Sequence, residues 1–282
     1  MTRHAALKLA VSLAFVVGTA AAGDSPIPGG LAGCAVPPEL LAIGPVLAHV
    51  AARMERGEPL TIVAIGSSST QGVGASAPGL SYPSRLEAEL KERFPDIAIR
   101  VINRGKGGEE APQMLARLDR DVIAEHPDLV VWQLGTNAVL RHDDVTFQES
   151  VIERGLARLK ESGSDVVLMD LQYAPRVIAR PGYAAMQRLI ADAAKREHAG
   201  LFHRFAIMQH WQSAQPADAP KMIGSDGLHM SDQGYACLAA DLAEAVAANW
   251  RAHQAMAAHS HAARLAGVAA SGRAAPAEAG AP

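Results

Sequence analysis

Apolar runs of strand length alternate with segments of helical periodicity through the middle of the chain. Strands are predicted at Leu60–Ile65, Ile97–Ile102, Asp128–Leu134 and Val166–Met169, with a short edge strand at Leu201–His203. Helices are predicted between and after them, at 83–94, 111–124, 146–162, 183–198 and 231–249. Unbroken apolar runs are typical of strands covered on both faces. The pattern therefore predicts an α/β protein, a three-layer α/β/α sandwich with a mainly parallel sheet.

The first 22 residues have the layout of a secretory signal peptide. The basic residues Arg3 and Lys8 precede an apolar run, Leu9–Val17. The small residues 20–22 follow the run, just before a polar segment. The apolar run is shorter than the roughly 20 residues of a spanning helix, and no later segment is long enough. We expect an exported protein, periplasmic or secreted, with no integral membrane segment in the mature chain.

Two terminal segments are expected to flank a single domain at 59–250. Residues 23–58 form an N-terminal extension, in which Leu31-Ala32-Gly33-Cys34 resembles the lipobox of bacterial lipoproteins. Polar residues and prolines separate it from the apolar run, which disfavours lipidation of Cys34. Residues 251–282 are rich in alanine with no apolar period and are expected to be a disordered tail.

The chain contains two cysteines, Cys34 and Cys237. An oxidising compartment permits them to pair. On the helix predicted at 231–249, Cys237 falls on the side of Asp241 and Glu244, which we expect to face solvent. A Cys34–Cys237 disulfide would occupy that thiol, and two unpaired small side chains are the alternative.

The net charge of the chain limits the kinds of partner that it can bind. The 26 basic and 29 acidic side chains give a net charge of −3. Removing Arg3 and Lys8 with the signal leaves 24 basic against 29 acidic residues, a net charge of −5. Such a chain is poorly suited to nucleic acid, which proteins bind through phosphate contacts from Lys and Arg.

A serine-rich turn, Gly66-Ser67-Ser68-Ser69-Thr70-Gln71-Gly72, follows the first predicted strand. Its position matters because ligands of parallel sheets bind at the carboxyl ends of the strands. No lysine follows Gly72, so the turn is not a phosphate-binding loop. The nucleophile elbow of α/β-hydrolases needs a second glycine at the position of Thr70, so membership of that family is disfavoured. Taken alone, the segment leaves a catalytic serine and a plain turn both open.

Polar groups also follow the next two strands. Asn103-Arg104-Gly105-Lys106-Gly107-Gly108 is a glycine-rich run in which backbone donors can approach a ligand closely. Gly135-Thr136-Asn137 places a side-chain amide at the same end of the sheet. Each segment by itself is compatible with a structural role.

Asp226-Gly227-Leu228-His229 precedes the last predicted helix. Residues three apart in a turn-like segment share a face. The Asp226 carboxylate can then hold the Nδ1 proton of His229 and leave Nε2 free as a base.

The four segments together resemble those of the SGNH hydrolases, also called the GDSL esterase/lipase superfamily. They occur in the family's order within roughly residues 60–249, as Gly66–Gly72, Asn103–Gly108, Gly135–Asn137 and Asp226–His229. The resemblance implies the flavodoxin-like fold of these enzymes.

It also implies a role for individual residues. Ser68 is the expected nucleophile, with His229 as its base and Asp226 as the partner of His229. The expected oxyanion hole consists of the backbone N–H groups of Ser68 and Gly108 and the side chain of Asn137. Two positions depart from the family: Ser67 replaces an acidic residue, and Ala138 replaces an aspartate that often follows the asparagine. Neither takes part in the expected reaction, and both bear on turn geometry and substrate placement.

The expected activity is hydrolysis of a carboxylic ester through an acyl-enzyme, with no metal or organic cofactor. O-acetyl groups on a glycan and small acyl or aryl esters are the substrate classes considered. Tyr173 and Arg176, in the loop after the fourth strand, are candidate substrate contacts. Two alternatives remain open at this point, an O-acyltransferase with the same triad and a non-catalytic glycan-binding protein.

Overall fold

A computed structural model describes residues 34–142, 144–214 and 221–271 of the chain. The signal segment expected at 1–22 lies outside the described residues, as do 23–33 and 272–282.

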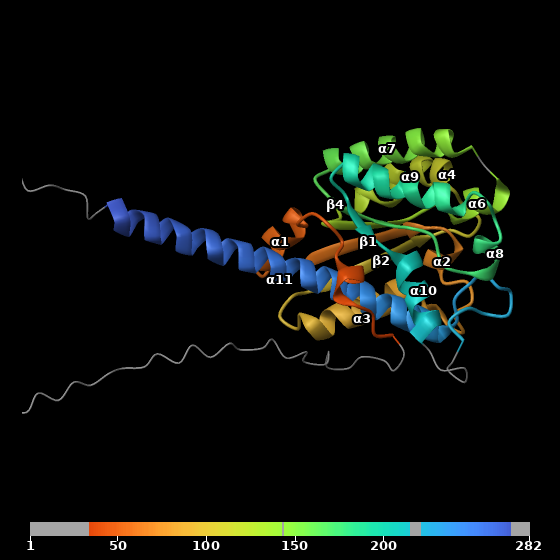
Figure 1. Ribbon diagram of the computed structural model, residues 1–282, viewed down its shortest axis with the longest axis horizontal. Coiled ribbons are helices and arrows are strands. Elements are labelled where there is room, and N and C mark those ends of the chain that lie inside the picture. Colours follow the sequence, from red (N-terminus) through yellow and green to blue (C-terminus); the bar gives the residue numbers. More distant parts are fainter. Residues whose placement is uncertain (1–33, 143, 215–220, 272–282) are drawn as a thin grey trace, which may run out of the picture. The chain divides into compact units, whose positions relative to one another are not determined.

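A five-stranded parallel sheet forms the centre of the fold (Figure 1). Its strands are β1 (Leu60–Gly66), β2 (Ile99–Gly105), β3 (Leu129–Gln133), β4 (Asp165–Met169) and β5 (Gly200–Phe202). They lie in the order β2-β1-β3-β4-β5. The order reverses between β1 and β3, which is the point where doubly wound sheets bind ligands. The predicted parallel α/β architecture is confirmed.

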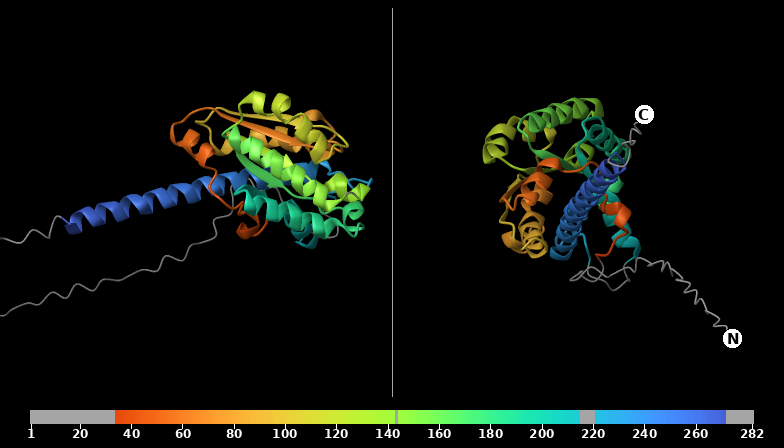
Figure 2. Two further views of the ribbon diagram at one scale, coloured as in Figure 1. Left: turned by 90° about the horizontal axis from the view of Figure 1, so that it is seen from above. Right: turned by 90° about the vertical axis from the view of Figure 1, so that its left-hand side faces the viewer.

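Helices cover both faces of the sheet (Figures 1 and 2). The helices are η1 (Pro38–Leu41), α1 (Ala48–Glu55), α2 (Ser68–Gln71), η2 (Pro78–Leu80), α3 (Tyr82–Arg93), α4 (Ala111–Ala116), α5 (Leu118–Asp121), η3 (Ile123–Glu125), α6 (Thr136–Arg141), α7 (Val145–Glu161), α8 (Pro175–Ile178), α9 (Tyr183–Arg196), α10 (Arg204–Ala214) and α11 (Asp232–Ser271). One hydrophobic cluster joins the sheet to α1, α3, α10 and α11, and a second joins it to α4, α5, α7 and α9.

The unbroken apolar strands supply side chains to both clusters. Along β1, Ile62 and Ala64 belong to one cluster, whereas Val63 and Ile65 belong to the other. All four are fully buried. Successive side chains of a strand point to opposite faces, so a strand covered by helices on both sides needs apolar residues at every position.

Helix α11 extends well past its predicted end at 249. It runs to Ser271, so the expectation of a disordered tail from 251 is wrong as far as that residue. Residues 251–264 are almost all exposed, which means that packing does not hold this part of the helix. Alanine has the highest helix propensity, and a preceding packed segment supplies the helical nucleus that is costly to form alone. The composition that indicated low complexity therefore also supports a helix.

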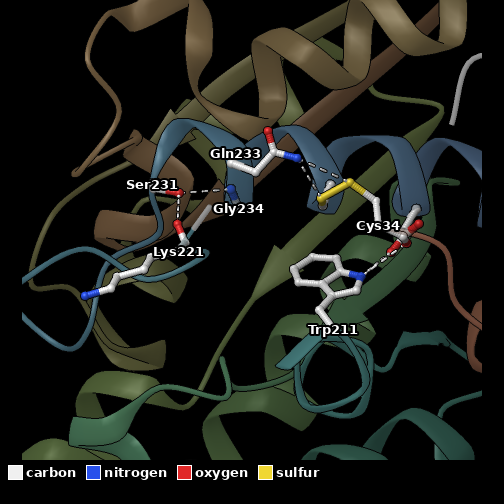
Figure 3. The surroundings of a disulfide bond; sticks show 8 residues. Cys34, Trp211, Lys221, Ser231, Gln233 and Gly234 are labelled. Carbon is white, nitrogen blue, oxygen red and sulfur yellow. Dashed lines mark hydrogen bonds between the residues drawn. A yellow bond between two sulfur atoms is a disulfide. The ribbon is translucent and has the colours of Figure 1, made fainter. Parts of the chain in front are cut away.

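A disulfide joins Cys34 to Cys237 on α11, with 5.0 Å between their Cα atoms (Figure 3). Both residues are buried, and so is Asp241 one turn further along the helix. The expectation that this side of the helix faces solvent is wrong, because the segment around Cys34 covers it. The Trp211 Nε1–H group donates to the Cys34 carbonyl at 3.3 Å and to Asp241 Oδ2 at 3.2 Å.

A second contact fixes the N-terminal segment further along α11. The Asn249 side chain accepts from the Leu47 backbone N–H at 3.0 Å and donates to the Pro45 carbonyl at 3.0 Å. Leu41, Leu47 and neighbouring apolar side chains lie in the same hydrophobic cluster as α11. Described residues of the expected extension are therefore part of the core.

Burial raises the pKa of Asp241 to about 8, although the hydrogen bond from Trp211 and the charge of Arg93 both act to lower it. Between the usual aspartate pKa near 4 and this value, the folded protein keeps a proton that the unfolded chain has released. Through this group, stability is greatest in acid and falls as the pH rises from about 4 to about 8.

The Asp241→Asn variant should remove this pH dependence, because the amide oxygen still accepts from Trp211 and carries no charge. At pH 9 we expect the variant to be more stable than the wild type by up to about 5 kcal/mol, the linkage value of a pKa raised from about 4 to about 8, with little difference at pH 4. Urea unfolding at both pH values measures the effect, with the exposed Asp96→Asn as control. If Asp241→Asn and the wild type differed in the free energy of unfolding by the same amount at pH 4 and pH 9, the raised pKa of Asp241 would be contradicted.

Candidate active site

The four polar segments meet at the carboxyl edge of the sheet, where they surround a pocket of about 400 Å³. The pocket lies beside the reversal in strand order between β1 and β3. Its lining residues are Ser68, Val73, Gly108, Asn137, Leu140, Arg141, Arg176, Leu228 and His229. Each of the four segments thus contributes at least one residue to one cavity.

A chain of hydrogen bonds links Ser68, His229 and Asp226. The Nε2 atom of His229 lies 2.9 Å from Ser68 Oγ, and its Nδ1 atom lies 2.5 Å from Asp226 Oδ2. The second carboxylate oxygen, Asp226 Oδ1, accepts from the backbone N–H groups of Leu228 and His229 at 3.0 Å each. These bonds hold the imidazole ring with Nδ1 toward the carboxylate and Nε2 toward the serine. The arrangement can pass a proton from a hydroxyl group to a histidine.

The environment of Asp226 favours its charged form. Partial burial acts to raise the pKa of Asp226, but hydrogen bonds from the His229 ring and from two backbone N–H groups outweigh it and lower the pKa. A carboxylate at this position accepts the Nδ1 proton of His229. The lone pair on Nε2 is then available to Ser68.

Three hydrogen-bond donors border the same pocket. Ser68 is the first residue of α2, so its backbone N–H has no acceptor within the helix. Gly108 has a left-handed backbone conformation, with φ of +77°, and its carbonyl accepts from Arg141 Nη2 at 2.9 Å. The Asn137 Nδ2 group donates to the Glu109 carbonyl at 2.8 Å. That bond uses one of the two amide hydrogens and fixes the side chain. The other hydrogen remains available to a ligand in the pocket.

The buried side chain of Gln133, at the end of β3, holds the serine turn in place. Its Oε1 atom accepts from the Ser67 backbone N–H at 2.8 Å, from Ser67 Oγ at 3.0 Å and from Thr70 Oγ1 at 3.3 Å. Ser67, which departs from the family pattern, therefore binds the sheet with both of its donors. The neighbouring Ser68 is left with its hydroxyl toward His229.

A second buried amide, Gln172, connects three of the segments. Its Oε1 atom accepts from Thr136 Oγ1 at 2.9 Å and, at the 3.5 Å limit, from Ser69 Oγ. Its Nε2 group donates to the Leu228 carbonyl at 3.3 Å. The amide thus bridges the turn after Ser68, the start of α6 and the loop that carries His229.

Helix α2 and the end of β2 meet through Gly105. A Cβ atom at this position would lie 2.1 Å from the Gln71 backbone nitrogen and 2.4 Å from the Thr70 carbonyl carbon. Both contacts are to backbone, which cannot move aside as a flexible side chain can. A glycine is therefore required for the glycine-rich segment to lie against the serine turn.

The two expected substrate contacts have different surroundings. Arg176 lines the pocket. Tyr173 does not, because its ring packs edge-to-face against Phe205 at 5.1 Å, in the interior between the hydrophobic clusters. The structure therefore does not bring Tyr173 to the pocket lining.

Four lining residues were not predicted from the sequence: Val73, Leu140, Arg141 and Leu228. Leu140 and Arg141 lie three and four residues after Asn137, so they share its face of α6. The helical spacing from Asn137 would have identified both. Leu228 lies between the two residues of the Asp226–His229 pair, and Val73 follows α2 directly.

Among the described residues, no three His, Cys, Asp or Glu side chains are grouped so that they could hold a metal ion. Within the same part of the chain, none of the helices combines the length and apolar character needed to cross a bilayer.

A model of the Non-GDSL lipase-like family matches residues 33–252, which is more than half of the chain. Together with the esterases described below, this match confirms the relation to SGNH hydrolases that the four segments indicated.

Two characterised proteins are similar in sequence over a shorter region. An acetylxylan esterase of Geobacillus stearothermophilus is 33% identical over 90 residues, covering 32% of this chain and 41% of the relative. An arylesterase of Vibrio mimicus is 34% identical over 95 residues, covering 34% of this chain and 46% of the relative. The matched region spans less than half of either relative.

Solved structures with the same fold include an Axe2 variant, an acetyl-xylooligosaccharide esterase from Geobacillus. It is 22% identical, with a TM-score of 0.58, and the match covers 67% of this chain and 95% of that one. A two-domain esterase active on acetylated mannans is 22% identical with a TM-score of 0.61, over 74% of this chain and 55% of that one. At such identities the likeness shows a shared fold.

We predict that Gly105→Ala destabilises the protein, because the added methyl group meets the backbone of α2. The expected loss in the free energy of unfolding is about 3 kcal/mol. Gly79→Ala is the matched control, since its Cβ would meet nothing within 4 Å, and it should change stability by less than about 0.5 kcal/mol. Chemical denaturation measures both. Equal stability of the two variants would contradict the close approach of α2 and β2.

Proposed function

The chain belongs to the Non-GDSL lipase-like family, and on this premise we propose that it is a serine esterase that hydrolyses a carboxylic ester through an acyl-enzyme. The observation that carries the proposal is the continuous hydrogen-bond chain from Ser68 through His229 to Asp226, with distances of 2.9 and 2.5 Å. The names of the two sequence relatives, an acetylxylan esterase and an arylesterase, support the same reaction class.

In the first half of the proposed reaction, Ser68 attacks the ester carbonyl. A serine hydroxyl is a poor nucleophile at neutral pH, so neutral His229 takes its proton as the C–O bond forms. The negative oxygen of the tetrahedral intermediate receives hydrogen bonds from the backbone N–H groups of Ser68 and Gly108 and from the Asn137 amide. Each such donor typically stabilises the transition state by about 2.7–4 kcal/mol.

In the second half, the intermediate collapses and the alcohol leaves. His229 gives its proton to the alcohol oxygen, while the Asp226 carboxylate stabilises the positively charged ring until that transfer is complete. Water then attacks the acyl-Ser68 ester with His229 again as the base. The acid is released and the hydroxyl of Ser68 is restored. Each proton in this cycle moves between the substrate, water and the chain's own side chains.

The apolar part of the pocket lining supports binding of an acyl group, and we propose acetyl as that group. Val73, Leu140 and Leu228 supply apolar surface beside Ser68. An acetyl methyl group gains from contact with such surface and needs little room. The acetylxylan esterase relative acts, by its name, on acetyl groups of a glycan. We therefore favour an acetyl ester on a glycan or a small alcohol.

Export is part of the proposal. The disulfide between Cys34 and Cys237 supports it, because such bonds persist in oxidising compartments outside the cytoplasm. The signal peptide predicted at 1–22 would direct the chain there. The proposed substrate is accordingly an ester found outside the cytoplasm.

Turnover of p-nitrophenyl acetate tests the proposal. The wild type should hydrolyse it, and Ser68→Ala should lower kcat by about 10⁴-fold or more, as expected when the nucleophile of a triad is removed. Ser67→Ala and Ser69→Ala are the controls at the neighbouring positions. Their kcat should fall far less, because these changes affect only the hydrogen bonds that support the turn. Circular dichroism checks that all four proteins are folded. An inactive wild type, or a Ser68→Ala variant as active as wild type, would contradict the proposal.

A further inference from the structure

The residues that line the pocket include two arginines, Arg141 and Arg176, and no aspartate or glutamate. Arg141 is already paired, because its Nη1 group contacts the Glu110 carboxylate and its Nη2 group donates to the Gly108 carbonyl. The guanidinium of Arg176 has no hydrogen-bond or ion-pair partner within the described residues. One uncompensated positive charge therefore faces the cavity that contains Ser68.

Arg176 is held next to the loop that carries the histidine. Its backbone N–H donates to the Gly227 carbonyl at 3.0 Å. Its Cγ atom lies 3.7 Å from the position that a Cβ on Gly227 would take. The side chain thus enters the pocket from the side of Asp226 and His229.

That side of the pocket is where the alcohol of an ester must lie. His229 delivers its proton to the leaving oxygen, so this oxygen has to be within hydrogen-bond reach of Nε2. The carbonyl oxygen points instead toward the donors of Gly108 and Asn137. A cation beside His229 therefore meets the alcohol part of the substrate rather than its acyl part.

A further arginine, Arg180, follows four residues after Arg176, just past the end of α8. The Arg180 Nη1 group donates to His142 Nε2 at 3.0 Å. This partner does not neutralise Arg180. The chain as a whole has a net charge of −3, so positive charge at the pocket runs against the overall balance.

We propose that the substrate's alcohol part carries a carboxylate, as in an O-acetylated acidic sugar, and that Arg176 binds this carboxylate. The inference rests on the esterase activity proposed above and names the substrate class of the same site. A guanidinium matches a carboxylate with two parallel hydrogen bonds, which a lysine cannot form. Because Arg176 is exposed, the pair is worth about 5-fold in kcat/KM, and salt weakens it.

Two acetyl esters that differ in one charge test the proposal. 4-Acetoxybenzoate carries a carboxylate on its alcohol part, and 4-acetoxybenzamide carries a neutral amide there. The wild type should prefer the carboxylate in kcat/KM by about 5-fold. The preference should shrink when the ionic strength rises from about 0.01 M to about 1 M, which shortens the screening length from about 30 Å to about 3 Å.

Variants assign the preference to one side chain. Arg176→Gln should lose the preference, so that its kcat/KM values for the two esters become nearly equal, and Arg176→Lys should keep part of the preference. Arg188→Gln removes an exposed arginine on α9, outside the pocket lining, and should keep the full preference. A wild type without preference for the charged ester, or a preference unchanged in Arg176→Gln, would overturn the inference. Failure to hydrolyse either ester would instead overturn the esterase function itself.

Discussion

The site depends above all on the hydrogen bonds of two buried amides, Gln133 and Gln172. A buried amide without partners costs free energy, and these two find partners only when separate segments of the chain are in position. Gln133 holds the serine turn against β3 through Ser67. Gln172 ties the turn, the start of α6 and the Leu228 carbonyl together. Displacement of any one segment leaves a buried polar group unsatisfied, and this opposes loose geometry between Ser68 and His229.

The last helix fixes the remaining segment, the loop of Asp226 and His229, from its other end. Helix α11 starts three residues after His229, and Asp232 at its first position accepts from the Ser76 backbone N–H and hydroxyl at 2.8 and 2.6 Å. The region just after α2 is thereby bound to the start of α11. Cys237, one to two turns along the helix, is joined to Cys34. The loop of Asp226 and His229 thus leads into a helix that is anchored at both points.

The sequence was sufficient for features that depend on local pattern or on a motif. The apolar runs predicted the parallel sheet, and the four polar segments predicted the residues that meet at its edge. Features that depend on distant parts of the chain were not predictable in this way. Helical spacing placed Cys237 beside Asp241 correctly, but it could not reveal that the segment at Cys34 covers that side. The sequence likewise offered no means to distinguish Tyr173, which packs on Phe205, from Arg176, which enters the pocket. Alanine-rich composition after 250 was compatible with both disorder and helix.

We propose that the geometry around Ser68 makes it a nucleophile, whereas its neighbours Ser67 and Ser69 have structural roles. Covalent labelling with a fluorophosphonate, followed by peptide mass spectrometry, tests this most directly because the reagent modifies a serine activated by a base. We expect one label per chain, located on Ser68, and no label on protein that is denatured before the reagent is added. A label on Ser67 or Ser69, or a folded protein that takes up no label, would contradict it.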